Sequence, residues 1–291
     1  MRDLLPQVGE FREPDRIEPL RGLSNRNFLV AIGQDEYIVR LASPNAGCLG
    51  ISREAEATAL RLAHAAGLGP EVVRYVLPEG HLITQPIAAR SFSEIPDRYR
   101  DPEVLRSVVR TVRRVHSLPT LDHAFDPFAR IRASFRRAAE ARVALPAGSA
   151  RVLCRLGEIE SARGPLVPPY LALCHNDLFA GNLLDANPIR LIDWEFAGMG
   201  DIFFDLATLL VSCDETAPLS NAHRHAILDE YFGEETPEHR RRLDDMVLVV
   251  QLHVVAWGLT HHALGTPAHG WEGFTFLGFA TDLLTEVLTA L

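Results

Sequence analysis

The sequence predicts an α+β fold of two lobes: a small N-terminal lobe built on an antiparallel sheet, and a larger, mainly helical C-terminal lobe. Three observations lead to this prediction: paired β-prone runs before residue 86, helical spacing of apolar residues after it, and a group of short strands inside the helical half. A chain of 291 residues is long enough for two lobes, since domains typically run to roughly 100–200 residues. We expect lobes of 1–86 and 87–291.

The β-prone runs of the first lobe come in pairs. Segments 27–32 and 37–41 are joined by turn residues and predict a hairpin, and segments 71–77 and 81–85 predict a second one. Between the hairpins, segment 51–66 carries Ala, Leu and Glu at helical spacing. A glycine follows directly, which suits the left-handed end of a helix. The first lobe should therefore hold two hairpins and one helix.

After Pro86 the pattern becomes helical. Asp101, Pro102 and Glu103 form a capped helix start, and apolar residues then recur every three or four positions. We expect further helices at 128–143, 151–162, 201–213, 239–262 and 276–290. Short apolar runs at 170–174, 182–185 and 190–194 interrupt this half and are separated by turn-forming residues. Polar loops between such strands are where functional residues concentrate.

Charge and composition narrow the class of partner. The 38 acidic residues outnumber the 29 basic ones, giving a net charge of -9 that repels nucleic-acid backbones and anionic lipid. We therefore expect a small-molecule partner and no nucleic acid. Residues 1–16 lack a signal peptide's apolar segment, and no uninterrupted apolar run is long enough to span a bilayer, so we expect no membrane insertion and a cytoplasmic location. The oligomeric state is left open, with a homodimer as one alternative.

The strand group contains the residue types that phosphoryl transfer needs. Segment 175–182 reads HNDLFAGN, and the third strand ends in IDWE at 192–195. The reaction needs a carboxylate that orients the acceptor hydroxyl, and oxygen ligands for the magnesium ions on the nucleotide phosphates. Asp177 suits the first role, and Asn182 and Asp193 suit the second.

A hairpin would bring the two metal-ligand candidates together. Asn187 and Pro188 join the strands that start at Asn182 and end at Asp193, so opposed side chains would lie about 5 Å apart. The register stays open, because proline fits poorly in tight primed turns. The simpler interpretation is that these are ordinary turn residues. The combined spacing HxDxxxxN, then a strand ending in Asp, favours a site, with His175 as a buried hydrogen-bonding scaffold for the loop.

The stretch HNDLFAGNLL, followed by IRLIDWEFAGMGDIFFDLATL, resembles the catalytic segment of the choline and ethanolamine kinase family. This family belongs to the aminoglycoside-phosphotransferase-like group, whose fold is protein-kinase-like. The resemblance implies an ATP- and Mg²⁺-dependent kinase with Asp177 as catalytic base and Asn182 and Asp193 as magnesium ligands. It also implies that Asp205 is a structural residue that steadies the catalytic loop. The resemblance runs from about residue 22 to residue 265.

Other segments resemble the family in the expected order. Segment 22–28, GLSNRNF, is similar to the family's nucleotide loop, in which Ser24 and Asn25 would cover phosphate. The resemblance places adenine between the lobes near residues 83–87, held by backbone groups.

The resemblance also implies a cation for the phosphates. Arg40 stands where many related kinases have lysine and where choline kinases have arginine. Glu56, on the following helix, matches the glutamate that pairs with this cation, and Glu54 is the alternative partner. Without the resemblance, all three would be interpreted as solvated charges on a strand and a helix.

For the acceptor, we identify Trp257 and Glu195 as candidates. A cationic alcohol would bind to aromatic faces and a carboxylate. The run AWGL at 256–259 resembles a helix of eukaryotic choline kinases that contributes two tryptophans to the choline pocket, but the second position is Thr260 here. The expected acceptor is choline or ethanolamine, with thiamine, aminoglycoside and sugar kinases as alternatives of the same fold.

Two alternatives come from other classes. A nucleotide-binding module without catalysis would usually lose the base or a metal ligand, whereas Asp177, Asn182 and Asp193 are all present. A hydrolase would need an activated nucleophile, and the sequence contains no GxSxG elbow or Cys-His signature.

Overall fold

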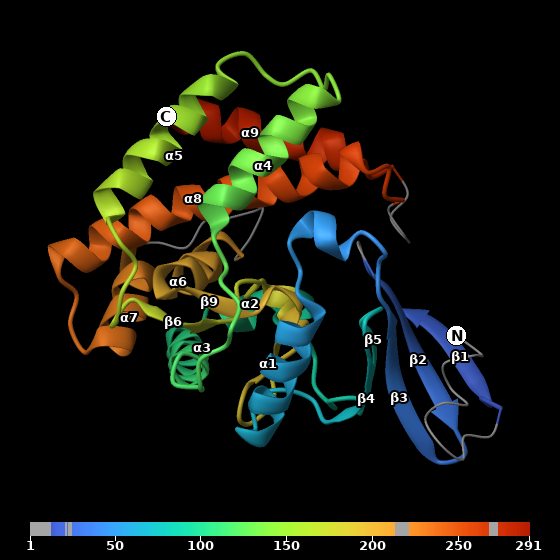
Figure 1. The fold of residues 1–291 in the computed structure, drawn as a ribbon. Coiled ribbons are helices and arrows are strands. Elements are labelled where there is room, and N and C mark those ends of the chain that lie inside the picture. Colours follow the sequence, from blue (N-terminus) through green and yellow to red (C-terminus); the bar gives the residue numbers. More distant parts are fainter. Residues whose placement is uncertain (1–12, 21, 23–24, 213–220, 268–272) are drawn as a thin grey trace.

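Two lobes of different construction lie side by side in the computed structural model, which describes residues 13–20, 22, 25–212, 221–267 and 273–291 (Figure 1). The N-terminal lobe holds a five-stranded antiparallel sheet in the order β1-β2-β3-β5-β4. The strands are β1 (Arg16–Leu20), β2 (Arg26–Ile32), β3 (Asp35–Leu41), β4 (Val72–Val76) and β5 (His81–Thr84). Both predicted hairpins are confirmed, and so is the α+β fold class.

Strand β1 was not predicted from the sequence. It pairs antiparallel with β2, with Ile17 opposite Val30, but all five of its residues are exposed. An edge strand with neither face buried has no apolar alternation to detect, and Pro19 further weakens the strand pattern. The sheet buries its own small cluster around Val30 and Val39.

Helix α1 (Arg53–Ala65) joins the two lobes. Ser52 caps its start by accepting a hydrogen bond from the backbone N–H of Ala55 at 3.2 Å. Its apolar face, including Leu60 and Ala63, belongs to the same buried cluster as the C-terminal helices, and α1 lies between the sheet and those helices (Figure 1). Because packing continues across the predicted boundary at residue 86, that boundary remains a prediction.

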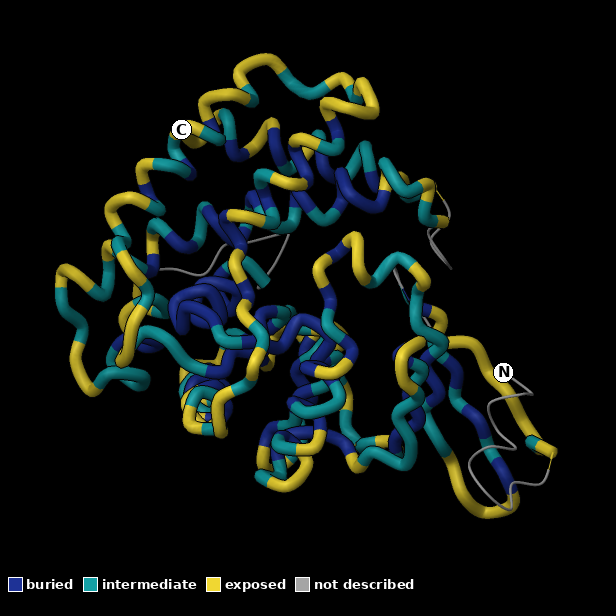
Figure 2. The backbone as a smooth tube through the Cα atoms, viewed as in Figure 1, coloured by how far each residue is buried: buried dark blue, intermediate teal, exposed yellow. Residues whose placement is uncertain are grey.

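Helices form most of the C-terminal lobe. They are α2 (Pro96–Tyr99), α3 (Pro102–Val115), α4 (Pro127–Glu140), α5 (Ser149–Arg163), α6 (Ile202–Val211), α7 (Asn221–Phe232), α8 (Pro237–Ala263) and α9 (Phe276–Ala290). Of these, α2 and α7 were not predicted: α2 is one turn long, and α7 buries the consecutive residues 226–228, which give no helical spacing. Helix α6 is buried along almost its whole length, as Figure 2 shows.

Four short strands and four 3-10 turns complete the described part of the fold. Strands β6 (Leu171–Cys174) and β9 (Gly198–Asp201) pair, as do β7 (Leu183–Leu184) and β8 (Arg190–Leu191). The 3-10 turns are η2 (Ala46–Leu49), η3 (Phe92–Glu94), η4 (Ala180–Asn182) and η5 (Trp194–Phe196). The predicted strand 190–194 is therefore too long. It ends at Leu191 because Asp193 adopts a left-handed conformation with φ 63°, which aspartate tolerates better than most residues.

Helix α8 is the longest helix in the part of the chain described here. It is the one described helix that is long and apolar enough to cross a bilayer, by length and composition alone. Its apolar residues pack against α4, α6 and α9 inside the C-terminal lobe, which is how a core helix behaves. The expectation of no membrane insertion remains a prediction.

One buried histidine of α8 should make the stability depend on pH. His261 is fully buried and stacks on Phe276 with 4.8 Å between ring centroids, and neither ring nitrogen has a hydrogen-bond partner among the described residues. Burial lowers the pKa of His261 to about 4. In the unfolded chain this histidine has its ordinary pKa of about 6.5. As the pH falls, His261 is therefore protonated in the unfolded chain before it is protonated in the folded protein. The contribution of His261 to stability is complete above about pH 6.5 and is lost as the pH falls towards 4.

We expect His261→Phe to lose less stability than the unsubstituted protein between pH 7 and pH 5, by about 1–2 kcal/mol, in urea unfolding at each pH. His262→Phe, at the exposed neighbouring position, should keep the original pH dependence. Parallel curves for all three proteins would contradict the assignment to His261.

Candidate active site

The segment after β6 carries Asp177, whose side chain is fixed by Asn182. The Asn182 Nδ2 donates to Asp177 Oδ2 at 2.7 Å and to the Asp177 backbone carbonyl at 2.9 Å. Both residues are half-buried. The other end of the Asn182 amide, Oδ1, accepts no hydrogen bond from any described residue, so it remains available as an oxygen ligand.

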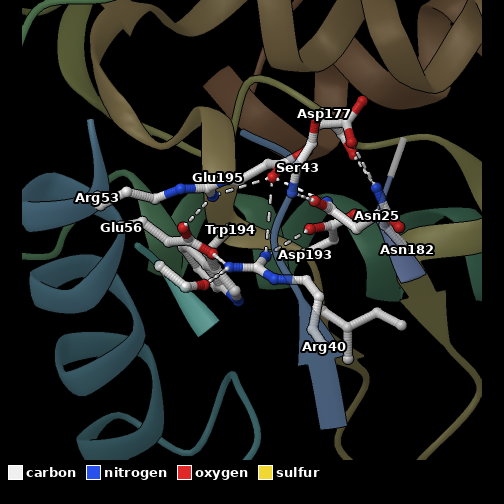
Figure 3. Close-up of polar contacts among 12 residues, drawn as sticks. Asn25, Arg40, Ser43, Arg53, Glu56, Asp177, Asn182, Asp193, Trp194 and Glu195 are labelled. Atoms are coloured by element: carbon white, nitrogen blue, oxygen red, sulfur yellow. Dashed lines mark hydrogen bonds and ion pairs between the residues drawn. The ribbon is translucent and has the colours of Figure 1, made fainter. Parts of the chain in front are cut away.

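The β7–β8 hairpin brings Asp193 back towards Asn182, as predicted, and the structure sets its register. Leu183 lies opposite Leu191, and the backbone N–H of Ile192 donates to the carbonyl of Asn182 at 3.0 Å. Asp193 follows directly. Its side chain is 35% exposed and accepts a hydrogen bond from Arg40 Nη1 at 3.2 Å. The three carboxylate and amide candidates thus gather between the lobes (Figure 3).

Arg40, on β3, pairs with Glu56 of α1. Arg40 Nη2 forms an ion pair with Glu56 Oε1, and Glu56 is fully buried. The Tyr75 hydroxyl donates to Glu56 Oε2 at 2.5 Å. Glu54 is exposed and accepts a hydrogen bond from Ser52 instead. Of the two partners left open by the sequence, the structure therefore selects Glu56.

Glu195 forms ion pairs with the N-terminal lobe, and the acceptor contact predicted for it remains a prediction. Its carboxylate is 4% exposed, and its Oε2 lies 3.1 Å from Arg53 Nη1 and 3.8 Å from Arg40 Nη1. The pairing arises because η5 packs against α1, which brings the Glu195 side chain to Arg53. Arg53 was missed by the sequence analysis, although its spacing of three from Glu56 is that of a helical ion pair.

Of the predicted nucleotide-loop residues, Ser24 lies outside the described residues. Asn25 is buried, and both ends of its amide make protein hydrogen bonds. Nδ2 donates to Glu195 Oε2 at 3.0 Å, and Oδ1 accepts from the Ser43 backbone N–H at 3.0 Å. Its predicted phosphate contact remains a prediction, while its observed contacts lock the start of β2 to the interlobe ion pairs.

Asp205 is hydrogen-bonded to the start of the catalytic loop, residues 175–182. One carboxylate oxygen accepts from the His175 backbone N–H at 2.8 Å, and the other accepts from the Asn176 N–H at 2.7 Å. His116, at the end of α3, also bonds to Asp205 through Nε2 at 3.0 Å and to the Tyr231 hydroxyl through Nδ1 at 2.7 Å. These contacts support the structural role predicted for Asp205. His116 was missed, because nothing in the sequence relates the end of α3 to this loop.

His175 is a buried scaffold in this arrangement. Its Nε2 bonds to the carbonyl of Ile192 at 3.0 Å, and its ring lies 4.6 Å from that of Trp194. Burial lowers the pKa of His175 to about 4, so the ring is neutral at pH 7 and acts as a hydrogen-bonding link between the catalytic loop and the β7–β8 hairpin.

The positive charges around Asp177 and Asp193 do not balance the negative charges of the carboxylates gathered there. Burial raises the pKa of Asp177 well above its usual range, and the charges of Asp193 and Glu195 raise it further. Burial and the Glu195 charge likewise raise the pKa of Asp193 to about 7, against the opposing effect of Arg40. Oxygen donors with an excess of negative charge fit a magnesium ion.

Trp257 lies on α8. It borders a cavity of about 360 Å³ between η2, α4 and α8, together with Phe196 and His253. Arg130 and Arg137 also line this cavity, and none of the described residues that line it is a carboxylate. At the position of the expected second tryptophan, Thr260 bonds to the Ser134 hydroxyl at 2.7 Å, and both hydroxyl groups border the cavity.

Gly80, in the turn before β5, should resist substitution. Its φ is +83°, and a Cβ added there would lie 2.3 Å from Arg53 Cδ. Its carbonyl accepts from Arg40 Nη2 at 3.2 Å. We expect Gly80→Ala to lower the free energy of unfolding by about 2–4 kcal/mol, from backbone strain plus the clash.

The matched control is Gly33→Ala, where φ is +64° and nothing lies within 4 Å. Gly33→Ala should lower the free energy of unfolding by the backbone strain alone, about 1 kcal/mol. Equal losses for both variants in urea unfolding would show that Arg53 does not pack on Gly80.

Asp205→Asn should weaken the loop support. An amide cannot accept from two backbone N–H groups and His116 at once, so a buried donor is left unpaired. We expect a loss of about 2–4 kcal/mol in urea unfolding, against less than about 0.5 kcal/mol for Asp282→Asn at an exposed position. A loss no larger than the control would argue against a supporting role for Asp205.

Comparison with known proteins identifies what the chain resembles. The family model described as the Phosphotransferase enzyme family matches residues 16–244. Protein LicA of Haemophilus influenzae is 28% identical over 225 residues, which cover 75% of this chain and 63% of that protein, so the chain spans less than two thirds of this relative's length. Thiamine kinase of Escherichia coli is 47% identical over 60 residues, or 20% of this chain and 22% of that protein.

Solved structures show the same architecture. A choline/ethanolamine kinase family protein from Mesorhizobium loti has a TM-score of 0.76 and 27% identity, covering 99% of this chain and 92% of that chain. Choline kinase LicA from Streptococcus pneumoniae has a TM-score of 0.77 and 19% identity, covering 100% and 99%. A LicA structure in complex with AMP has a TM-score of 0.71 and 19% identity, covering 98% of each. The last two likenesses concern the fold alone.

Proposed function

Because the chain belongs to the phosphotransferase enzyme family and has a protein-kinase-like fold, we propose that it transfers the γ-phosphate of ATP to the hydroxyl of a small cationic alcohol, with choline as the first candidate. The observation that carries this proposal is the hydrogen bond that fixes Asp177 to Asn182, with Asp193 and Arg40 gathered beside them. A non-catalytic binding module would have no need to orient a carboxylate in this way.

Asp177 is the proposed base. Asn182 Nδ2 occupies its Oδ2, which leaves Oδ1 for the acceptor hydroxyl. Orienting that hydroxyl towards the terminal phosphate is the main task, since phosphoryl transfer depends mostly on positioning and charge stabilisation. The Asp177 carboxylate accepts the hydroxyl proton as the new P–O bond forms.

Magnesium, when bound, supplies positive charge to the phosphate oxygens. Asn182 Oδ1 and the Asp193 carboxylate are the residues that would hold it. Arg40 then binds phosphate oxygens directly. Its guanidinium is held ready by Glu56 and by the carbonyl of Gly80, so little ordering remains to be done when the nucleotide binds.

We propose ATP as the donor and place it between the lobes. Adenine would lie against the backbone that follows β5, near residues 83–87. A LicA structure that shares the fold is a complex with AMP, which supports a bound nucleotide. An acidic net charge of -9 favours a small-molecule acceptor over nucleic acid.

Choline is the first candidate acceptor because of the likeness to LicA and to the Mesorhizobium loti protein. Trp257 would provide the aromatic face for its ammonium group. Thiamine is the closest alternative cation, supported by the 60-residue match to thiamine kinase.

A second class of acceptor is favoured by the lining of the Trp257 cavity. Two arginines and two hydroxyl-bearing residues border it, and the described part of its lining contains no carboxylate. Such a lining repels a cation and offers hydrogen bonds to a polyol. Neutral sugars therefore belong in the same test as choline.

The test is a coupled ADP-release assay with Mg²⁺ over choline, ethanolamine, thiamine, hexosamines, neutral sugars and aminoglycosides. We expect turnover that needs Mg²⁺, with choline giving the highest kcat/KM. Asp177→Asn should lower kcat by about 10²–10⁴-fold, because the proton acceptor is lost.

The exposed Asp97→Asn serves as control and should keep full activity. Unchanged turnover in Asp177→Asn would remove this residue from the mechanism, and a higher kcat/KM for sugars than for choline would replace the proposed acceptor.

A further inference from the structure

Three elements of the N-terminal lobe converge on one carboxylate oxygen of the other lobe. Glu195 Oε2 accepts from Asn25 Nδ2 at 3.0 Å and from Arg53 Nη1 at 3.1 Å, and it lies 3.8 Å from Arg40 Nη1. These residues come from the start of β2, from α1 and from β3. Figure 3 shows their side chains meeting at Glu195. Its side chain is 4% exposed and that of Arg53 is 6% exposed.

Glu195 is rigidly connected to Asp193. Only Trp194 separates them, and the Trp194 side chain is fully buried. Its Nε1 donates to the carbonyl of Leu191 at 3.1 Å, and its ring packs on His175 of the catalytic loop. The backbone between Glu195 and Asp193 therefore has little freedom. A change in the position of Glu195 would also move Asp193.

Arg53 links this carboxylate to the Arg40 partner. The same nitrogen, Nη1, donates to Glu56 Oε2 at 2.8 Å and to Glu195 Oε2 at 3.1 Å. Without Arg53, the carboxylates of Glu56, Asp193 and Glu195 would share only the Arg40 guanidinium. Uncompensated buried carboxylates repel one another strongly, so the lobes would separate at this point or Arg40 would be drawn away from Asp193.

We propose that Arg53 and Glu195 form a positioning pair that holds the nucleotide-binding lobe onto the segment carrying Asp193, so that Arg40 and Asp193 face the same phosphate groups. This inference rests on the proposed function of the site. Neither member of the pair touches substrate. The pair therefore sets the affinity and orientation of the nucleotide, while the acceptor binds independently of it.

The pair predicts a specific kinetic pattern. Arg53→Met should raise KM for ATP and lower kcat, each by about tenfold, and should leave KM for the acceptor within about twofold. Arg53→Lys should recover most of the loss, because one ammonium can make both hydrogen bonds that Nη1 makes. Glu195→Gln should resemble Arg53→Met.

The double variant is the decisive comparison. If the two residues act as a pair, Arg53→Met with Glu195→Gln should be no worse than Arg53→Met alone, because the second change removes the charge that the first leaves unpaired. The control is Arg155→Met, whose side chain is 42% exposed and pairs with Asp245; it should leave all constants unchanged.

A readout without turnover separates this inference from the proposed function. We would measure the rise in Tm on adding Mg²⁺ and ADP to each variant. The rise should be at least halved in Arg53→Met and Glu195→Gln, and restored in Arg53→Lys. If the variants show this pattern of Tm changes but no acceptor is turned over, the role of the pair in nucleotide binding is supported and the proposed reaction is contradicted.

The opposite results would overturn the pair. A lower Tm with an unchanged ADP-induced rise and unchanged KM for ATP would make Arg53 a merely structural residue. Multiplicative losses in the double variant would show that the residues act separately. If Arg53→Met does not fold, Glu195→Gln and Arg53→Lys decide: a normal KM for ATP in Glu195→Gln contradicts the proposal.

Discussion

A buried group of two guanidinium ions and three carboxylates is the constraint on which the arrangement of the lobes depends. Arg40 and Arg53 meet Glu56, Asp193 and Glu195, and four of these five side chains are at most 6% exposed. Moving such charges out of water is costly unless each finds a partner of opposite sign. Arg53 and Glu56 pair within α1, but the other ion pairs of this group join β3, α1 and the segment at the end of the β7–β8 hairpin, so these three elements have to come together.

The same group explains local features that would otherwise be separate. Gly80 lies under the Arg53 side chain and offers its carbonyl to Arg40, which restricts the turn before β5 to glycine. Three carboxylates against two guanidinium ions leave an excess of negative charge next to Asp177. Burial raises the pKa values of Asp177 and Asp193, and the neighbouring carboxylates raise them further; this is the charge balance on which the proposed cation site rests.

The C-terminal lobe supplies a rigid support for the catalytic loop. Asp205 lies on α6, a helix buried along almost its whole length, and accepts hydrogen bonds from the loop and from His116 at the end of α3. The loop is thus attached to two core helices directly before Asp177. Because Asp177, the proposed base, and Asp193, a proposed metal ligand, lie on different segments, the Asp205 contacts and the interlobe ion pairs each position one part of the candidate site.

The sequence by itself determined the fold class, both hairpins of the first lobe, the main helices and the grouping of Asp177, Asn182 and Asp193. These depend on local periodicity and on residues close in the chain, which a single sequence displays. Only the tertiary structure selected Glu56 over Glu54, added Arg53 and His116, and showed Glu195 in the interlobe ion pairs. Each of these contacts except Arg53–Glu56 joins residues on different elements. The sequence does not show which partner a charged side chain has, because packing decides which elements come together. The exposed strand β1 could not be predicted for a related reason. Its pairing with β2 is made by backbone groups, which do not depend on the identity of its exposed side chains.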